Sequence, residues 1–360
     1  MDGWRGFLAV LVMFAHANQI FISPMVGVHN YNGWFFSALA HVAVLGFFTI
    51  SGVAITMSIV ININRNDQDL NFRQYIIARV ARIYPPLLFS ILLCFLFYAV
   101  IYGFDLLGGV DSYRLPGDLF VARDFFAFEF KDVLKTLGFE RGGMVKVNGP
   151  LWSLIIEWWI YFLALFFTGM FFSKNKYVKI VSLFLFLLIL NKIVRINGLV
   201  YLAIWLLGSI FFLVKNHKKW MVNLLFIGSL TGLVVSNFFL KFYEDRTDIT
   251  LLPMVQLLIG LLFFSIVLLF PVKSIFNKIS NYSYSIYIMH YPIFLFIFSL
   301  FHKVTNGLLV INIVLALVAV VVVFVVAANS WSIIENKKYF AQKFNNALQF
   351  IHHKLTLIKA

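Results

Sequence analysis

The sequence predicts an all-α fold: a polytopic integral membrane protein of about ten transmembrane helices, with both termini cytoplasmic. Of the 360 residues, 62% are hydrophobic and only 12% are charged, roughly half the charged share of a soluble domain. The mean hydropathy is +0.91, and long apolar runs recur along the whole chain. A soluble fold has too little interior for so many apolar side chains, whereas a bilayer solvates them along each helix.

Each spanning helix needs ~20 mostly apolar residues. The fifth and sixth predicted spans are separated only by residues 191–198, and fusing them would reverse the orientation of all later spans. The ten predicted spans are 4–22, 35–60, 86–104, 151–172, 178–194, 199–214, 221–240, 251–270, 283–301 and 308–334.

The distribution of Lys and Arg residues along the chain predicts the orientation of the helices in the membrane. Most of the 29 Lys and Arg residues fall in alternate loops and after the last span, which the positive-inside rule assigns to the cytoplasm. A cleavable signal peptide ending at Ala15-His16-Ala17 would leave nine spans and contradict this pattern. The net charge of +14 does not indicate nucleic-acid binding, because the cations lie between apolar runs rather than on one soluble face.

Two segments are predicted to lie at the membrane surface. Residues 117–138 mix apolar and charged side chains and would lie on the outer surface. Residues 337–360 form a basic amphipathic cytoplasmic tail suited to anionic lipids, so the transmembrane bundle is expected to comprise residues 1–336. Cys94 is the single cysteine and forms no intrachain disulfide.

Ionisable groups inside a span are costly, by ~2.5–3.5 kcal/mol on insertion scales, and each is a candidate functional group. His16 lies 11 residues beyond Arg5, and Glu157 six residues after Leu151. At a rise of ~1.5 Å per residue, both would lie ~9 Å below the outer surface. A carboxylate beside a neutral imidazole would orient it as a base. The alternative is two unrelated polar groups, each bonded to a neighbouring helix.

Two further buried histidines are assigned less direct roles. His290 is expected ~10 Å above the inner surface, too deep to pair with His16. Pro292 frees a carbonyl in the preceding turn, so a core hydrogen bond and a substrate contact are equally compatible with His290. His41 is interpreted as a structural hydrogen-bond partner.

Arg79 and Arg82 lie three residues apart, on one helical face at the predicted inner surface. There they would grip the phosphates of a cytosolic donor. The alternative is ordinary positive-inside anchoring.

Five motifs together resemble the membrane acyltransferase-3 family. They occur in the family's order across residues 2–335, and Glu335 is similar to a common family ending. The motifs are Asp2-Gly-Trp-Arg5-Gly6 with ten residues between Arg5 and His16, Phe47-Phe48-Thr-Ile-Ser51-Gly52, Arg79-Val-Ala-Arg82-Ile-Tyr-Pro85, Leu151-Trp152-Ser153-Leu-Ile-Ile-Glu157 and Ser283-Tyr-Ser285-Ile-Tyr287-Ile-Met-His290-Tyr-Pro292.

The resemblance implies transfer of an acyl group, commonly acetyl, from cytosolic acyl-coenzyme A to a sugar hydroxyl on the other side of a bacterial inner membrane. Arg5 and His16 match its best-known functional pair, and Arg79 with Arg82 its donor-associated pair. Family members usually carry residues before the Asp-Gly, so this start is expected to be late or truncated. Many also carry a C-terminal hydrolase-like domain; a single-domain member must complete transfer within the bundle or pass the acyl group to a partner in glycan assembly.

The predicted mechanism places acyl-coenzyme A, which the resemblance implies is commonly acetyl-coenzyme A, near Arg5, Arg79 and Arg82. His16, oriented by Glu157, deprotonates the acceptor hydroxyl; an acyl-histidine intermediate is a variant of the same step. Trp152, Ser153 and His290 are the expected substrate contacts, and Trp152 is alternatively an aromatic-belt anchor. The expected partners are membrane lipids and a glycan acceptor, with neither a metal nor a nucleic acid. The competing classes are a transporter or flippase for a lipid-linked saccharide and a purely structural membrane partner.

Overall fold

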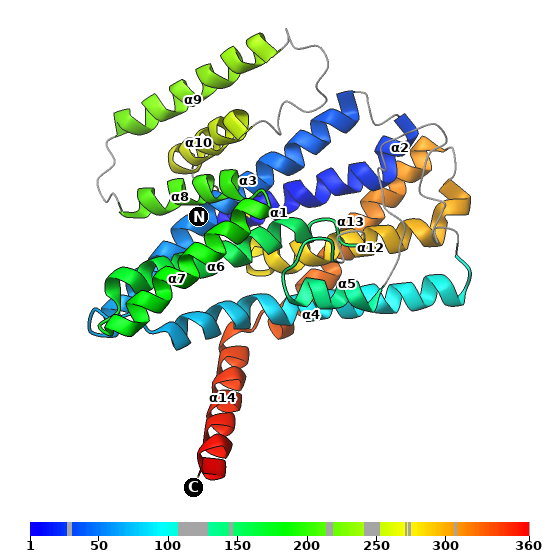
Figure 1. Ribbon diagram of the computed structural model, residues 1–360. Helices are drawn as coiled ribbons and strands as arrows, with labels where there is room; N and C mark the ends of the chain where they lie inside the picture. Colours follow the sequence, from blue (N-terminus) through cyan, green and yellow to red (C-terminus); the bar gives the residue numbers. More distant parts are fainter. Residues whose placement is uncertain are drawn as a thin grey trace.

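The computed structural model describes residues 1–26, 31–106, 129–143, 147–213, 219–240, 253–270, 272, 275–305 and 308–359. All secondary structure in these ranges is helical (Figure 1), as predicted. The helices are α1 (Asp2–Ala17), a π-helix (Asn18–Ile22), α2 (Ser23–Val26), α3 (Tyr31–Arg65), α4 (Phe72–Gly103), α5 (Phe130–Leu137), α6 (Leu151–Phe172), α7 (Lys176–Arg195), α8 (Leu199–Leu213), α9 (Lys219–Leu240), α10 (Pro253–Leu269), α11 (Ile275–Ile279), a 3₁₀ turn (Ser280–Tyr282), α12 (Ser283–Thr305), α13 (Leu309–Ile334) and α14 (Lys337–Lys359).

Seven helical segments within the described residues are long and apolar enough to cross a membrane. Three further apolar helices are shorter: Leu199–Leu213, Trp220–Val235 and Pro253–Leu269. Together they match the positions of the ten predicted spans, while the count of ten and the side of the termini stay predictions. The fifth and sixth spans are separate helices, because α7 ends at Arg195 and α8 begins only at Leu199.

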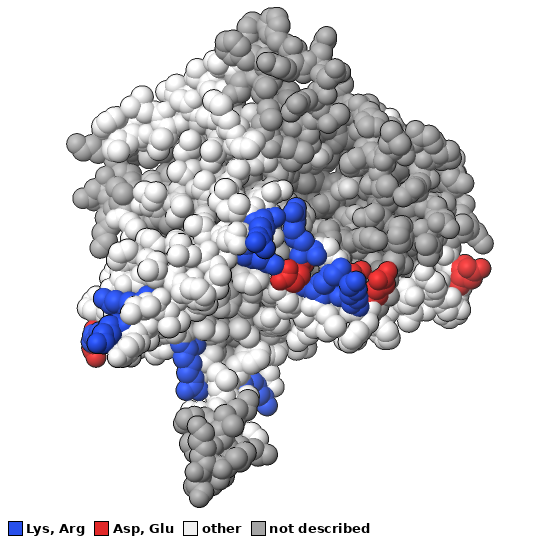
Figure 2. All heavy atoms as spheres, viewed as in Figure 1, with Lys and Arg blue, Asp and Glu red and all other residues white. Residues whose placement is uncertain are grey.

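The surface of the bundle is apolar where a membrane would touch it. Side chains of α7 and α13 point outward, and Phe184 and Val310 are 62% and 74% exposed. Most of the described surface seen in Figure 2 is uncharged, and Lys and Arg gather in a few places. So large an exposed apolar area is untenable in water. The protein is therefore a multi-pass membrane protein.

Helix α1 packs in the interior against α3, α11 and α12, and two glycines allow its close contact with α11 and with Val272 before it. A Cβ at Gly6 would lie 2.2 Å from the Phe276 carbonyl oxygen, and one at Gly3 would lie 2.1 Å from that of Val272. Small residues let membrane helices approach at backbone distance. The contact also fixes the register of α1 against the segment that begins at Ile275.

Two predicted span boundaries are wrong. Helix α4 begins at Phe72 rather than at residue 86 and continues through Pro85 and Pro86, because the more polar residues 72–85 are also helical. The ninth span begins at Ile275 rather than 283, because α11, the 3₁₀ turn and α12 follow one another without a break. Polar residues such as Asn277 and Lys278 concealed this earlier start.

The chain after the last predicted span forms a helix of its own. Helix α13 ends at Ile334, and α14 begins at Lys337 and points away from the bundle (Figure 1). Its first half contacts α4, where Arg73 donates to the Asn345 carbonyl at 3.4 Å. Of the predicted surface segment 117–138, residues 117–128 lie outside the described residues, and the remainder contains α5.

Candidate active site

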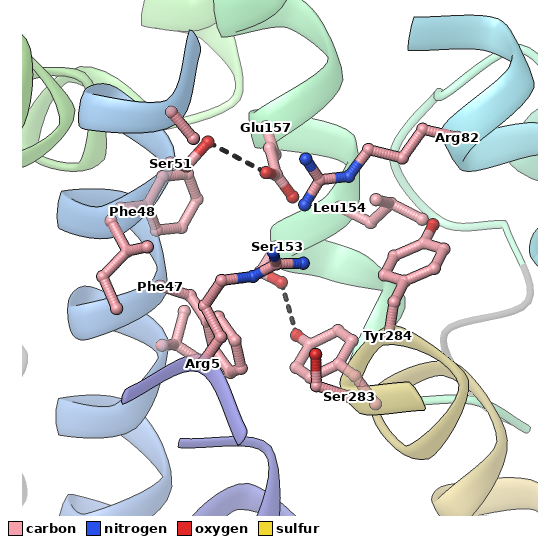
Figure 3. Close-up of a pocket in the computed structure, with 14 residues that line it drawn as sticks. Arg5, Phe47, Phe48, Ser51, Arg82, Ser153, Leu154, Glu157, Ser283 and Tyr284 are labelled. Atoms are coloured by element: carbon pink, nitrogen blue, oxygen red, sulfur yellow. Dashed lines mark hydrogen bonds between the residues drawn. The ribbon is translucent and has the colours of Figure 1, made fainter. Parts of the chain in front are cut away.

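A small cavity lies where α1, α3, α4, α6 and α12 converge (Figure 3). It encloses about 60 Å³, several times the minimum for one water molecule. Apolar side chains of α3 form one wall. Its polar lining comes from Arg5, Ser51, Arg82, Ser153, Glu157, Ser283, Tyr284 and Tyr287. The cavity thus brings together four sequence-predicted site residues: Arg5, Arg82, Ser153 and Glu157.

Glu157 is the carboxylate of this cavity, and one bond from α3 and one from its own helix hold it in place. It accepts a hydrogen bond from the Ser51 hydroxyl at 3.0 Å and another from the Tyr161 hydroxyl. Figure 3 shows the guanidinium groups of Arg5 and Arg82 entering the same cavity. Two arginines with one carboxylate leave an excess of positive charge, which suits an anionic ligand.

Arg79 does not line this cavity, and it does not lie at an exposed membrane surface as predicted. Its side chain is buried between α3, α4 and α6, with 8% of the residue exposed. It donates to the Ser58 hydroxyl at 2.9 Å and lies over the rings of Tyr75 and Tyr161. The earlier start of α4 explains the difference, because it places the arginine pair inside a span. Arg79 therefore supports the ring of Tyr161, which in turn bonds Glu157.

The cavity is closed on one side by a tyrosine. The Tyr287 hydroxyl forms a hydrogen bond with the Ser153 hydroxyl and donates to the Pro150 carbonyl at 3.0 Å. The Tyr287 ring packs edge-on against Phe47 and, 6.1 Å away between centroids, His290. Tyr287 thus contacts both the arginine-lined cavity and His290. The sequence predicts no role for Tyr287, although the residue lies within the motif of residues 283–292.

Beyond Tyr287, His16 bonds to His290 and not to Glu157. The His16 Nδ1 lies 2.9 Å from the His290 Nε2, and the rings are stacked with centroids 5.0 Å apart. The prediction that His290 lies too deep for this pairing is wrong. It assumes that the span begins at residue 283, whereas the helical segment begins at Ile275. Gly6 of α1 packs beside Ser280, and ten residues further along both parallel segments His16 meets His290.

The hydrogen bonds determine which ring nitrogens carry protons. His290 Nδ1 lies 2.9 Å from the Ile286 carbonyl, which only accepts, so in the neutral ring Nδ1 is protonated and Nε2 is an acceptor. His16 must then donate to it from Nδ1. The remaining nitrogen, His16 Nε2, keeps its lone pair and can accept a proton. A π-helix, a form frequent at functional sites, follows at Asn18.

Helix α12, which carries His290, is tied to its neighbours by hydrogen bonds to a carbonyl group that Pro292 leaves without a helical partner. Pro292 has no N–H, so the carbonyl of Ile288 loses its helical partner. The Ser90 hydroxyl and the Asn148 amide take over, donating to this carbonyl at 3.0 and 2.8 Å. These bonds tie α12 to α4 and to the segment before α6. They hold the histidine pair in a rigid surround, as a precisely oriented base requires.

The other predicted residues lie apart from the histidine pair. The Trp152 ring stacks nearly parallel on His41, with centroids 6.4 Å apart, and does not line the cavity. His41 is a hydrogen-bond partner as predicted, with its Nε2 2.9 Å from the Gln256 amide nitrogen. Within the part of the chain that the structure describes, no three His, Cys, Asp or Glu side chains are placed to hold a metal ion.

Comparison with known proteins identifies a family. The sequence model of the family described as an acyltransferase domain (acyltransferase 3) matches residues 1–328. This range contains every helix that lines the cavity and both histidines. No curated protein and no solved structure matches the chain.

Proposed function

Because the chain belongs to the acyltransferase-3 family and is a membrane acyltransferase, we propose that it moves an acyl group, commonly acetyl, from acyl-coenzyme A to a sugar hydroxyl. In this proposal the N-terminal face of the bundle is cytoplasmic and the acceptor is an extracytoplasmic or lipid-linked glycan. The membrane would be the bacterial inner membrane. The observation that carries the proposal is the His16–His290 pair, 2.9 Å apart between ring nitrogens, with Tyr287 contacting both His290 and the arginine-lined cavity.

His16 acts as the base. Its Nε2 takes the proton of the acceptor hydroxyl while the hydroxyl oxygen attacks the thioester carbonyl carbon. The carbon–sulfur bond breaks, and the electron pair leaves on the coenzyme A sulfur, which takes the proton from the His16 imidazolium. The products are an acyl ester and coenzyme A. Attack by Nε2 itself, giving an acyl-histidine that the hydroxyl then cleaves, uses the same lone pair.

His290 is a positioning residue for this base. As His16 gains positive charge, its Nδ1–H bond to the His290 Nε2 strengthens, and the bond from His290 to the Ile286 carbonyl fixes the direction of that chain. Glu157 is instead the counter-charge of Arg5 and Arg82 in the donor cavity. Tyr287 lines the donor cavity and packs against His290, so it lies between the proposed donor site and the histidine pair.

Acceptor-dependent release of coenzyme A tests the proposal. Purified protein in lipid nanodiscs is supplied with acetyl-coenzyme A, and free thiol is measured with and without glycan from the source cells. We expect thiol release only with acceptor, and a matching mass increase of one acetyl group on the glycan. Transport of the glycan without thiol release would favour the flippase class and contradict the proposal.

A further inference from the structure

A second and larger pocket opens next to the donor cavity, at the N-terminal end of α1. It has a volume of about 690 Å³ and is lined by residues from α1, α11, the 3₁₀ turn and the end of α13, together with Val272 and Lys337, the first residue of α14. Arg5 lines both this pocket and the inner cavity. The two spaces therefore lie on either side of one guanidinium, which could contact a single ligand that occupies both.

The outer pocket offers the groups that an adenine nucleotide requires. Arg5 and Lys337 bring two cations toward phosphate oxygens. Trp331 also lines the pocket, and an indole is a side chain on which a purine can stack. The amides of Asn277 and Asn281 can pair with the donor and acceptor edge of adenine, as asparagine does elsewhere.

The two carboxylates of the pocket, Asp2 and Glu335, already have partners within the protein. Their electrostatic repulsion of an anionic ligand is therefore reduced. Glu335 accepts hydrogen bonds from the Ser285 backbone N–H at 2.8 Å and from the Ser285 hydroxyl, in the first turn of α12. Asp2 lies 3.7 Å from the Arg5 guanidinium. The Glu335 charge is thus used to stabilise the beginning of the helix that carries His290.

We infer that this outer pocket binds the phosphoadenosine end of the donor thioester, with Trp331 and Lys337 as binding residues that the sequence motifs did not indicate. The inference rests on the proposed function, because it assumes a coenzyme A thioester as donor. The geometry agrees with it: Arg5 is 11 residues from His16 along α1, ~16 Å. A pantetheine arm that crosses about half of the ~30 Å membrane core spans this interval.

The test compares two donors, acetyl-coenzyme A and the acetyl thioester of N-acetylcysteamine, which has no nucleotide. For Lys337→Gln and Trp331→Leu we expect the KM for acetyl-coenzyme A to rise about tenfold, the effect of one lost charge-assisted bond or stacking contact. The kcat/KM for the short thioester should stay within about twofold of wild type. Lys338→Gln, an equal charge change on the neighbouring exposed lysine, should leave both donors unaffected.

Adenosine 3′,5′-bisphosphate provides a second measurement without turnover. It should compete with acetyl-coenzyme A in the wild type and compete about tenfold less well in the Lys337→Gln variant. Equal losses with both donors, or no change with either, would overturn the nucleotide pocket while leaving the proposed function intact. A wild-type protein that transfers acetyl from neither donor would instead refute the proposed function.

Discussion

Replacing His16 by alanine is expected to lower acyl transfer at least ~10²-fold, the usual contribution of a general base. The protein should still fold, because the lost group is a neutral imidazole and its removal leaves a small cavity rather than an unpaired charge. Donor affinity should change little, since Arg5 and Arg82 are untouched. Acetyl transfer is measured per mole of monodisperse protein, so that misfolding is not counted as lost chemistry.

His41 provides the matched control for this variant. It is also a half-buried histidine within the bundle, and its ring nitrogen is bonded to Gln256 away from the cavity. His41→Ala should therefore lower stability by about 1–3 kcal/mol at most and keep near-normal turnover per folded molecule. Normal turnover by folded His16→Ala protein would remove His16 as the base.

The second large effect is expected at His290. His290→Leu removes the acceptor for the His16 Nδ1–H, so the base loses its fixed tautomer and orientation. We expect kcat to fall ~10²-fold, an effect of the kind seen when the orienting partner of a catalytic histidine is lost. KM for the donor should stay nearly constant, because the arginine-lined cavity does not include His290.

His290→Gln separates positioning from structure. The glutamine carbonyl can accept from the same N–H, and we expect it to recover at least ~10-fold of the rate lost in His290→Leu. A merely structural role predicts poor yield of both variants, with normal kcat in the folded fraction. Equal kcat for the leucine and glutamine variants would contradict the positioning role.

The positions of the helices were predictable from the sequence because the hydrophobic pattern of a membrane protein is strong. Apolar runs of span length predicted ten helices, and each corresponds to an apolar helix in the structure. Even the short break between α7 and α8 was correctly placed. The prediction succeeded because an unsatisfied polar group in the hydrocarbon region of a bilayer costs several kcal/mol. Polar residues are therefore rare within the spans.

Contacts between distant segments were less predictable, because each depth estimate depended on one uncertain helix end. Helix ends at the membrane surface carry mixed sequences, and the segment around Asn277 and Lys278 resembled a loop. An error of eight residues there corresponds to ~12 Å along a helix. This was enough to separate His290 from its true partner and to make Glu157 appear the better one.

The different environments of Arg79 and Arg82 were also not predictable from the sequence. The spacing of Arg79 and Arg82 predicted that they lie on the same side of a helix. It did not predict how much of that helix lies inside the bundle. Continuation of α4 through Pro85 brings Arg82 into the cavity and buries Arg79 against two tyrosine rings. Only the packing of α3 and α6 around α4 distinguishes these two environments.

Sidedness of the reaction tests the central claim most directly, that a donor bound at the N-terminal face is used for transfer at the opposite side. Radiolabelled acetyl-coenzyme A, which does not cross membranes, is added outside sealed vesicles of the source membrane that contain the acceptor glycan. We expect label on the glycan in inverted vesicles, with the cytoplasmic face outward, and none in right-side-out vesicles until they are permeabilised. Equal labelling in sealed right-side-out vesicles would contradict it.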